Sequence, residues 1–561
     1  MKNKAIIKKV NSTKDSVKKF KDKLSSAALA TTLVTTSVLT GLYDEAKAAD
    51  TTFSANDIWD ATLNNALAPA DDIILNGTVT LTLAGQAITG LGTANGVIIM
   101  GDAGAHTSTE NVIIDINSTA ALSIDRAINE VAGGGAVASI KVDDDADGVA
   151  VDAVTFGGAI GLSVAPNSLL VGTSGTTGGH AIFNAAAKFG AVTLAGGDTG
   201  EISIIDYKGA QAGNITIGDS DSTAKVIFSG NTVSAIAGNI LGAGANEGTL
   251  QVTGTGKTFA GTIGGTELRL VDIDATTTVN NTFDSRLVEI AAGATLSVDD
   301  DFQGDVTTLT GTGGISFVSD SSAAASTLGG VINGATDGSG TLTYTNTAQS
   351  IQTGAVGVGS GNGIGTIAVG AAGLIDFVGI VDSQNLTVLA GGVVSYDDDA
   401  THDAAVLTTT GKIMYEVDAD GAAATVVTGT INGAAGDNGV IQTNNGNTTT
   451  FVSAIGSQHA LKTVTLTTQA IFNGEVRALG MTTAQSQVNQ FKGDLSIGAS
   501  KFIITGAAGE AMFNGTGDQT VTGKIEGSSA HNGVIDNANT GGTLTFASAD
   551  LGVELKEIEL D

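Results

Sequence analysis

Thr-Gly-Thr-Ile-Asn-Gly-Ala-Ala-Gly-Asp-Asn-Gly-Val-Ile occupies residues 428–441, and Thr-Gly-Lys-Ile-Glu-Gly-Ser-Ser-Ala-His-Asn-Gly-Val-Ile occupies residues 522–535. Eight of these fourteen positions are identical, so the chain contains a long internal repeat. Two earlier copies are weaker, and the anchor isoleucines of the four copies, Ile240, Ile332, Ile431 and Ile525, are 92, 99 and 94 residues apart. A unit of about 95 residues is too long for one turn of a solenoid and suits four or five turns of about 20 residues.

Short runs that alternate apolar residues with threonine fill the space between these anchors. Val79–Leu83 reads V-T-L-T-L, and Val464–Thr467 reads V-T-L-T. This period of two predicts strands with valine and leucine inward and threonine outward. Turn-forming pairs such as Asn76-Gly77 and Asn532-Gly533 separate the runs. We therefore predict an all-β chain, a right-handed parallel β-helix, with a tandem array of β-sandwich repeats as the alternative.

A second repeated feature is the tripeptide Phe-x-Gly. With 79 glycines in 561 residues, chance predicts two or three such tripeptides among 17 phenylalanines, yet there are eight. In a solenoid, these phenylalanines would stack inside while the glycine turns the chain at the next corner. The phenylalanines are Phe156, Phe228, Phe259, Phe302, Phe377, Phe472, Phe491 and Phe513.

Composition excludes several classes of protein. Hydrophobic residues make up 42% of the chain, which is enough to form a core, and cysteine is absent. A disulfide framework, a thiolate zinc site and a cysteine nucleophile are therefore excluded. The formal net charge of −32 opposes binding to nucleic acid or to anionic lipid, since both require clustered lysine or arginine. The same charge would attract divalent cations.

The N-terminus has the order of regions typical of a secretory signal. Residues 1–23 hold nine lysines, an apolar and threonine-rich run extends from Leu24 to Leu42, and Ala46-Lys47-Ala48 follows. A basic region, an apolar region and an A-x-A site predict a signal peptide over residues 1–48 and export to the cell surface. A retained amphipathic helix is the alternative.

The rest of the chain divides by how clearly it repeats. Residues 49–230 share the composition but repeat poorly, which predicts an N-terminal solenoid with a cap near Ile58, Trp59 and Leu63. Residues 231–561 form the repeat region. Its last unit begins near Thr522, and we expect that unit to be incomplete at Asp561.

The repeated motifs resemble those of large bacterial autotransporter passengers, and most closely the rickettsial outer membrane protein B type of surface antigen. The resemblance covers roughly residues 230–561. It implies a parallel β-helical passenger, surface display, a crystalline S-layer-like coat and adhesion to host cells. The residues that carry it are Ile431-Asn432-Gly433, Gly340–Tyr344, Gly542–Phe546, Phe472-Asn473-Gly474 and Phe513-Asn514-Gly515.

The chain departs from that family at its C-terminus, where the translocator barrel has no counterpart. The sequence shows no terminal aromatic residue and no series of ten-residue membrane strands. We therefore expect any outer-membrane association to be made without a barrel of this chain's own. The expected partners are other copies of the chain, in a lattice or lateral assembly, or a receptor on the host-cell surface.

Residues arranged for catalysis are not found in the sequence. Its five histidines are scattered, and no H-E-x-x-H or G-x-S-x-G motif occurs. We therefore predict a non-enzymatic protein, with no catalytic or cofactor-binding residues. The alternative is a β-helical carbohydrate-active enzyme, either a polysaccharide lyase or a hydrolase. Such an enzyme would need carboxylates grouped with lysine or arginine on one face.

One acidic loop has the spacing of a calcium site. Residues 143–148 read D-D-D-A-D-G, which places Asp143, Asp145 and Asp147 on one tight loop. The glutamate that usually completes such a site is replaced by Val154, and Asp152 could substitute for it. A solvated acidic turn is the alternative, both here and at three looser clusters: Asp299–Asp301 with Asp305, Asp397–Asp399 with Asp403, and Asp219 with Asp221.

Overall fold

The structure is a computed structural model of the chain. It describes strands β1 to β9 and segment 121–130 between residues 51 and 143, and then residues 153–560. Short stretches at 173–177, 197–201, 219–223, 319–325, 360, 417–423, 445, 548–549 and 553 are not described. The predicted signal peptide at residues 1–48 lies outside the described residues.

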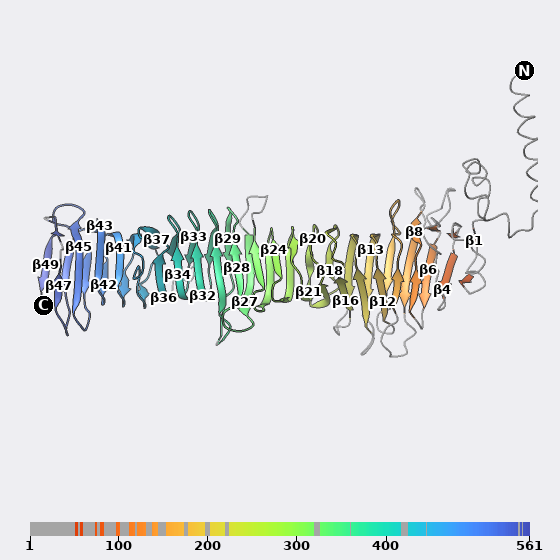
Figure 1. The fold of residues 1–561 in the computed structure, drawn as a ribbon, viewed down its shortest axis with the longest axis horizontal. Helices are drawn as coiled ribbons and strands as arrows, with labels where there is room; N and C mark the ends of the chain where they lie inside the picture. The colour runs from red at the N-terminus through yellow and green to blue at the C-terminus, as the bar shows by residue number, and fades with distance from the viewer. Residues whose placement is uncertain are drawn as a thin grey trace, which may run out of the picture.

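The described residues form a long rod of short strands that run across its axis (Figure 1). They contain 49 strands and no helix, so no helix of the described part could cross a membrane. Every strand pairing is parallel and joins one turn to the next. The predicted parallel β-helix is confirmed, and the β-sandwich alternative is wrong because sandwiches are built from antiparallel strands.

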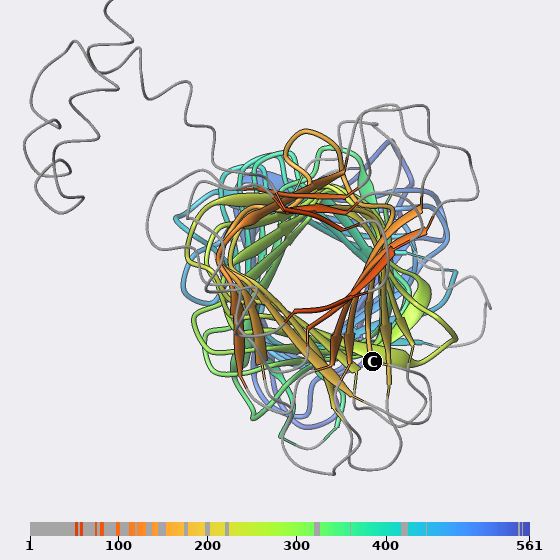
Figure 2. The same ribbon diagram turned by 90° about the vertical axis from the view of Figure 1, so that its right-hand side faces the viewer.

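Each turn crosses three sheets, and one turn shows how. Strand β20 (Lys257–Phe259) lies in the first sheet. Strand β21 (Ile263–Ile273) is bent, so that Ile263 lies in the second sheet and residues 268–273 lie in the third. Strand β22 (Thr277–Val279) then returns to pair with β20. Figure 2 looks along the rod and shows the closed outline that the three sheets make.

The length of a turn varies. One short turn leads from Phe283 to its partner Phe302, whereas a longer one leads from Ile315 to its partner Leu342. Where the register between paired strands shifts, it shifts inside the long bent strands, as between Ser496 and Lys501, and the pairing on either side of the shift is regular. The chain therefore keeps its inward and outward positions although the turns differ in length.

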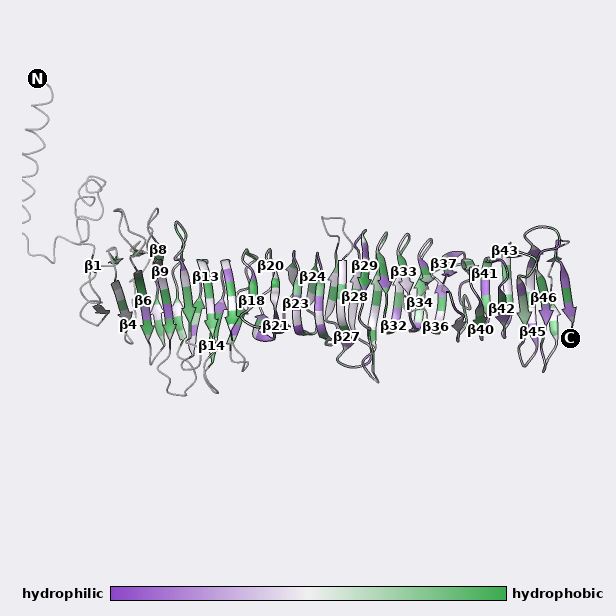
Figure 3. Ribbon diagram, turned by 180° about the vertical axis from the view of Figure 1, so that it is seen from behind, coloured by the Kyte–Doolittle hydropathy of each residue, from purple (hydrophilic) through white to green (hydrophobic). Residues whose placement is uncertain are grey.

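The core runs along the whole described rod. Most strands alternate buried and less buried positions, as in β14 (Ser203–Tyr207), and the buried positions are mainly isoleucine, valine, leucine and phenylalanine. Figure 3 shows the matching alternation of hydrophobic and hydrophilic residues along the strands. This alternation excludes water from the interior and leaves threonine, serine and acidic residues outside.

The predicted stack of phenylalanines is confirmed, and tyrosines extend it. Rings in the same sheet lie parallel, as do Phe472 and Phe491 in the third sheet, whose ring centroids are 5.2 Å apart. Where the next ring lies in a different sheet, the two rings meet edge-on, as Tyr415 and Phe451 do at 83°. Both arrangements are favourable for aromatic pairs, so the ladder continues when it changes sheet.

The glycines of the Phe-x-Gly motifs lie at a corner, but a special backbone angle is not the reason. None of the eight has a positive φ. Instead, a Cβ added to Gly230 would lie 1.9 Å from the carbonyl oxygen of Lys208 in the preceding turn, and one added to Gly493 would lie 2.5 Å from the backbone of Gly474. Glycine is required at these two positions because the backbones of successive turns come into contact there.

The first described strands already belong to the solenoid. Strand β2 (Asp57–Trp59) pairs in parallel with β4 (Val79–Leu83). Leu63 lies outside the described residues, and the cap predicted around it stays a prediction.

Candidate functional site

The predicted calcium loop falls mostly outside the described residues. Asp143 is the last residue of β9 (Val137–Asp143) and pairs with Asn117 of the preceding turn. Asp145, Asp147 and Asp152 are not among the described residues, so calcium binding there stays a prediction. Within the described part, no group of three or more acidic or histidine side chains is arranged to hold a metal ion.

Two of the looser aspartate clusters have a structural use. Asp301 accepts a hydrogen bond from the backbone N–H of Thr327 at 2.7 Å, and Asp399 accepts one from Val426 at 2.6 Å. Asp494 does the same for Thr520 at 2.7 Å. Each carboxylate thus satisfies a backbone donor where the strand of the following turn begins. Asp219 and Asp221 lie outside the described residues.

Three strands accept this arrangement, in which an aspartate of the preceding turn binds a backbone N–H near the first residue of the strand, and all three are long bent strands of the repeat. They are β27 (Ser326–Gly334), β36 (Thr425–Gly433) and β45 (Gln519–Gly527), with nine residues each. In each strand the bonded N–H stands five residues before the anchor isoleucine, because 332 − 327, 431 − 426 and 525 − 520 all equal five. The repeat is therefore reproduced in hydrogen bonds as well as in sequence.

A glycine makes the bend in each of these strands. Gly330, Gly429 and Gly523 have φ values of 78°, 98° and 95°. A Cβ on Gly429 would lie 1.3 Å from the carbonyl oxygen of His402, and one on Gly523 would lie 2.1 Å from that of Ile497. Only glycine can both adopt this conformation and leave room for the preceding turn.

A corner loop of constant form follows each anchor. The four corner loops are residues 242–248, 334–340, 433–439 and 527–533, and each begins and ends with glycine. The fifth residue of every loop has a positive φ: Asn246 at 64°, Gly338 at 78°, Asp437 at 71° and His531 at 68°. The final glycine also has a positive φ, between 78° and 88°. In the last three loops the second to fourth residues are exposed, in the first loop the second and fourth are, and both end glycines of every loop are buried.

The pairing registers show how successive units are placed around the rod. From Ile332 the pairings run through Val356, Val381, Ala400 and Val427, which makes four turns in one sheet. The next anchor, Ile431, stands four residues further, past the bend and in the next sheet. One unit therefore spans four and one third turns.

The other two intervals repeat this arrangement. From Ile240, four pairings lead through Ile263, Phe283 and Phe302 to Leu328, and Ile332 follows four residues later. From Ile431, four pairings lead through Ile455, Val476 and Leu495 to Val521, and Ile525 follows four residues later. The anchors thus lie in the second, third, first and again second sheet.

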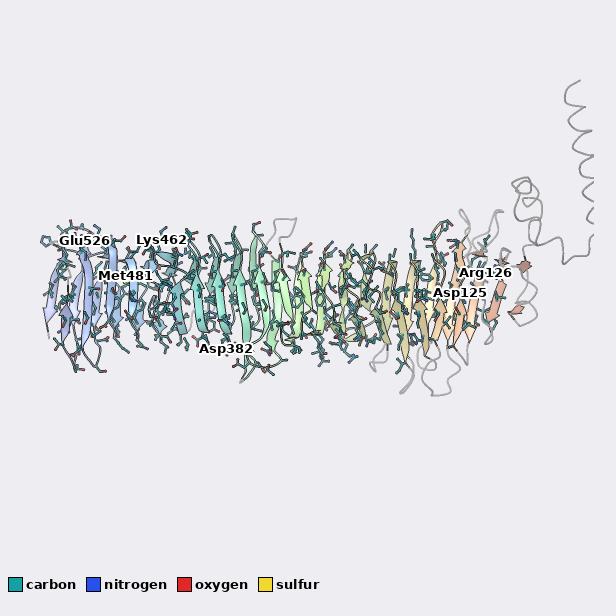
Figure 4. All side chains as sticks on the ribbon, in the orientation of Figure 1. Asp125, Arg126, Asp382, Lys462, Met481 and Glu526 are labelled. Carbon is teal, nitrogen blue, oxygen red and sulfur yellow. The ribbon has the colours of Figure 1, made fainter. Side chains whose placement is uncertain are left out.

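The side-chain view agrees with this rotation. Figure 4 shows Asp382 at the lower edge of the rod. The charge of Asp337, in the second corner loop, raises the pKa of the Asp382 carboxyl, so the two residues lie close together. Glu526, next to the fourth corner loop, lies at the upper edge. Equivalent loops of different units therefore point in different directions.

Acidic side chains lie close together on the outer surface of several turns. Asp272 and Glu289 occupy paired positions of adjacent turns, and burial together with Asp274 and Glu289 raises the pKa of Asp272. Burial and neighbouring acids also raise the pKa of Glu267, Asp284, Asp376, Asp382 and Glu510. This surface repels anions, and its acids are close enough to repel one another.

The basic side chains of His402 and Lys257 are buried in the core. His402 Nδ1 lies 2.7 Å from Ser383 Oγ, and its Nε2 lies 2.8 Å from the hydroxyl of Tyr396, while burial lowers the pKa of His402 to about 4. Lys257 donates hydrogen bonds to the Thr232 carbonyl and to Ser234 Oγ. Neither residue was predicted to be buried. The sequence carries the signal, because His402 stands two residues after the inward Ala400 and Lys257 stands two residues before the inward Phe259, and side chains two apart in a strand point to the same face.

Comparison with known proteins adds no relative. No family model, no curated protein and no solved structure matches the chain.

Proposed function

We propose that the chain is a non-enzymatic, exported surface protein that serves as a structural coat or as the rod of a passenger. The observation that supports this most is the unit of four and one third turns. A catalytic groove on a β-helix requires chosen side chains to converge on one sheet. Here the repeated features of each unit lie one sheet further round than those of the unit before it, so successive units do not place them on the same sheet.

The distribution of charge supports the same proposal. A carbohydrate-active β-helix needs carboxylates near lysine or arginine. The acids with raised pKa are surrounded mainly by other acids, as Asp382 is by Asp337 and Asp403. The two polar side chains that meet at His402 are buried with it, where no polymer could reach them.

The test is protease treatment of intact cells that carry the chain, with and without chelation of calcium, followed by mass spectrometry of the released peptides. Release of peptides from residues 49–561 without lysis would support surface display. Greater release after chelation would support calcium at Asp143, Asp145, Asp147 and Asp152. Peptides that appear only after lysis would contradict the proposal and favour the enzyme alternative.

A further inference from the structure

Asparagine followed by glycine forms a pair that can modify itself. The backbone nitrogen of the glycine loses its proton and attacks Cγ of the asparagine side chain, which closes a five-membered succinimide and releases ammonia. Water then opens the ring to aspartate, or to isoaspartate, in which the main chain runs through the former side chain. Seven such pairs lie within the described residues, and they begin at Asn333, Asn362, Asn432, Asn438, Asn473, Asn514 and Asn532.

In five of the seven pairs the glycine N–H is held by a hydrogen bond. A bonded donor keeps its proton and its direction, so the bond has to break before the nitrogen can attack. The fold therefore protects these five pairs. The acceptors are Gln519 Oε1 for Gly515, at 2.9 Å, and backbone carbonyl oxygens, at 2.9–3.1 Å, for Gly334, Gly433, Gly439 and Gly533.

The two other glycines, Gly363 and Gly474, donate no hydrogen bond from their N–H within the described residues. Gly363 is buried, and a Cβ built on it would lie 2.7 Å from Asp337 Oδ1, so a carboxylate opposes the loss of its proton. Gly474 is partly exposed, and the side chain of Asn473 is exposed and makes no hydrogen bond within the described part of the chain. The fold thus leaves the pair at Asn473 free to react.

The charges around Asn473 favour the reaction. Lys492 occupies the equivalent position in the next turn, and a positive charge there stabilises a deprotonated amide. The nearest acid along the chain is Glu475, whose Oε1 lies 3.7 Å from Nε of Arg477, so that its charge is offset. The carboxylate formed at residue 473 has the same lysine as its neighbour.

A second Phe-Asn-Gly tripeptide at the same corner gives the contrast. Residues 472–474 and 513–515 lie in the same sheet, two turns apart. Asn514 Nδ2 donates a hydrogen bond to Gln490 Oε1 at 2.9 Å, and the N–H of Gly515 donates one to Gln519 Oε1. Neither bond has a counterpart at the first tripeptide within the described residues. The tripeptides are identical, so the fold is what distinguishes the two asparagines.

From this contrast we infer that Asn473 is a site of spontaneous modification, where the folded chain converts its own asparagine to aspartate and isoaspartate. The inference does not depend on the proposed function. Isoaspartate adds one atom to the main chain where backbones of successive turns touch. A Cβ on Gly474 would lie 2.7 Å from the nitrogen of Ala454, and one on Gly493 would lie 2.5 Å from the carbonyl carbon of Gly474. The longer main chain has to push these turns apart, so the corner loses stability.

The experiment follows each pair in the purified full chain at mildly alkaline pH, by mass spectrometry of peptides, with electron-transfer fragmentation to identify isoaspartate. A parallel incubation in urea gives the rates of the unfolded chain. We expect conversion of Asn473 in the folded chain to be at least about tenfold faster than that of Asn514, because Asn514 and Gly515 first have to give up their hydrogen bonds. In urea the two rates should be similar.

Two variants test the cause. Gln519→Ala removes the acceptor of the Gly515 N–H and should speed the conversion of Asn514, whereas Gln519→Glu keeps an acceptor oxygen and should leave it slow. Circular dichroism and urea unfolding establish that both variants fold. If Gln519→Ala does not fold, the comparison between the folded and the unfolded natural chain decides by itself.

Conversion should also lower the urea midpoint of the natural chain. Asn473→Asp carries the new charge on an ordinary main chain and should keep the midpoint of the fresh protein. Equal rates at Asn473 and Asn514 in the folded chain, or a difference that persists unchanged in urea, would overturn the inference. An unchanged midpoint after conversion would overturn its second part, the loss of stability at the corner.

Discussion

His402 is buried, and burial disfavours the protonated, positively charged form of its imidazole. In the unfolded chain a histidine binds a proton near pH 6.5, whereas in the folded chain His402 binds one only near pH 4. Protons therefore favour the unfolded state between these values. The stability that neutral His402 contributes is present above pH 6.5 and is lost as the pH falls towards 4.

We expect the natural chain to lose about 3 kcal/mol from this residue between pH 7 and pH 4, the equivalent of about 2.5 pKa units. The measurement is the urea midpoint at both pH values for the natural chain and for His402→Asn. Outer acids with raised pKa act in the opposite direction in both proteins, so the difference between the two isolates His402. Equal pH dependence in both proteins would contradict the prediction.

The tyrosines of the aromatic ladder allow a paired test at the same scale. The hydroxyl of Tyr344 is buried without a hydrogen-bond partner among the described residues, whereas that of Tyr396 bonds to His402. Tyr344→Phe removes an unpaired polar group and should raise the stability by about 1 kcal/mol. Tyr396→Phe leaves a histidine nitrogen unpaired and should lower it by about 1–3 kcal/mol. Urea unfolding at pH 7 measures both, and a loss of stability in Tyr344→Phe would refute this account.

At the scale of the element, the bent strand depends on its glycine. Gly429→Ala forces a Cβ into the carbonyl oxygen of His402 at a positive φ, so β36 has to move away from the preceding turn. We expect a loss of more than about 2 kcal/mol, and a similar loss for Gly523→Ala in the equivalent strand β45.

Gly436→Ala is the matched control, because a Cβ there meets nothing within 4 Å and the residue lies at the exposed part of a corner loop. Its urea midpoint should change by less than the equivalent of about 0.5 kcal/mol. If Gly429→Ala is tolerated as well as Gly436→Ala, the bend does not require glycine.

At the scale of the whole molecule, each turn contacts mainly its neighbours, so a complete turn can be removed. Phe472 pairs with Phe491 of the next turn, and deletion of residues 472–490 joins equivalent positions. The inward face of every later strand stays inward. We expect a folded rod that is shorter by about 4.8 Å, which small-angle scattering would measure against the natural chain.

Deletion of residues 472–481 is the contrasting case. It removes about half a turn, so the strands that follow would meet the wrong sheets. Circular dichroism and urea unfolding should show a broad loss of structure for this variant. If both deletions are tolerated equally, pairing between successive turns does not fix the register.

The sequence by itself determined the class of fold, because alternation of period two and the Phe-x-Gly motifs are local and can be read along the chain. It also determined the approximate length of the repeat, because the segments around Ile431 and Ile525 share eight of fourteen residues and a weaker copy surrounds Ile332. The roles of Asp301, Asp399 and Asp494 could not be read in this way, since their partners stand 26 or 27 residues further on.

Only the tertiary structure decided that a unit makes four and one third turns. Because the turns differ in length, dividing the unit by an average turn gives four or five turns and no sheet assignment. The number of turns in a unit comes from the hydrogen-bond pairing between strands of successive turns, and this pairing exists only in the folded chain. That pairing places Ile332 in the third sheet, Ile431 in the first and Ile525 in the second, and so presents the repeat on every side of the rod.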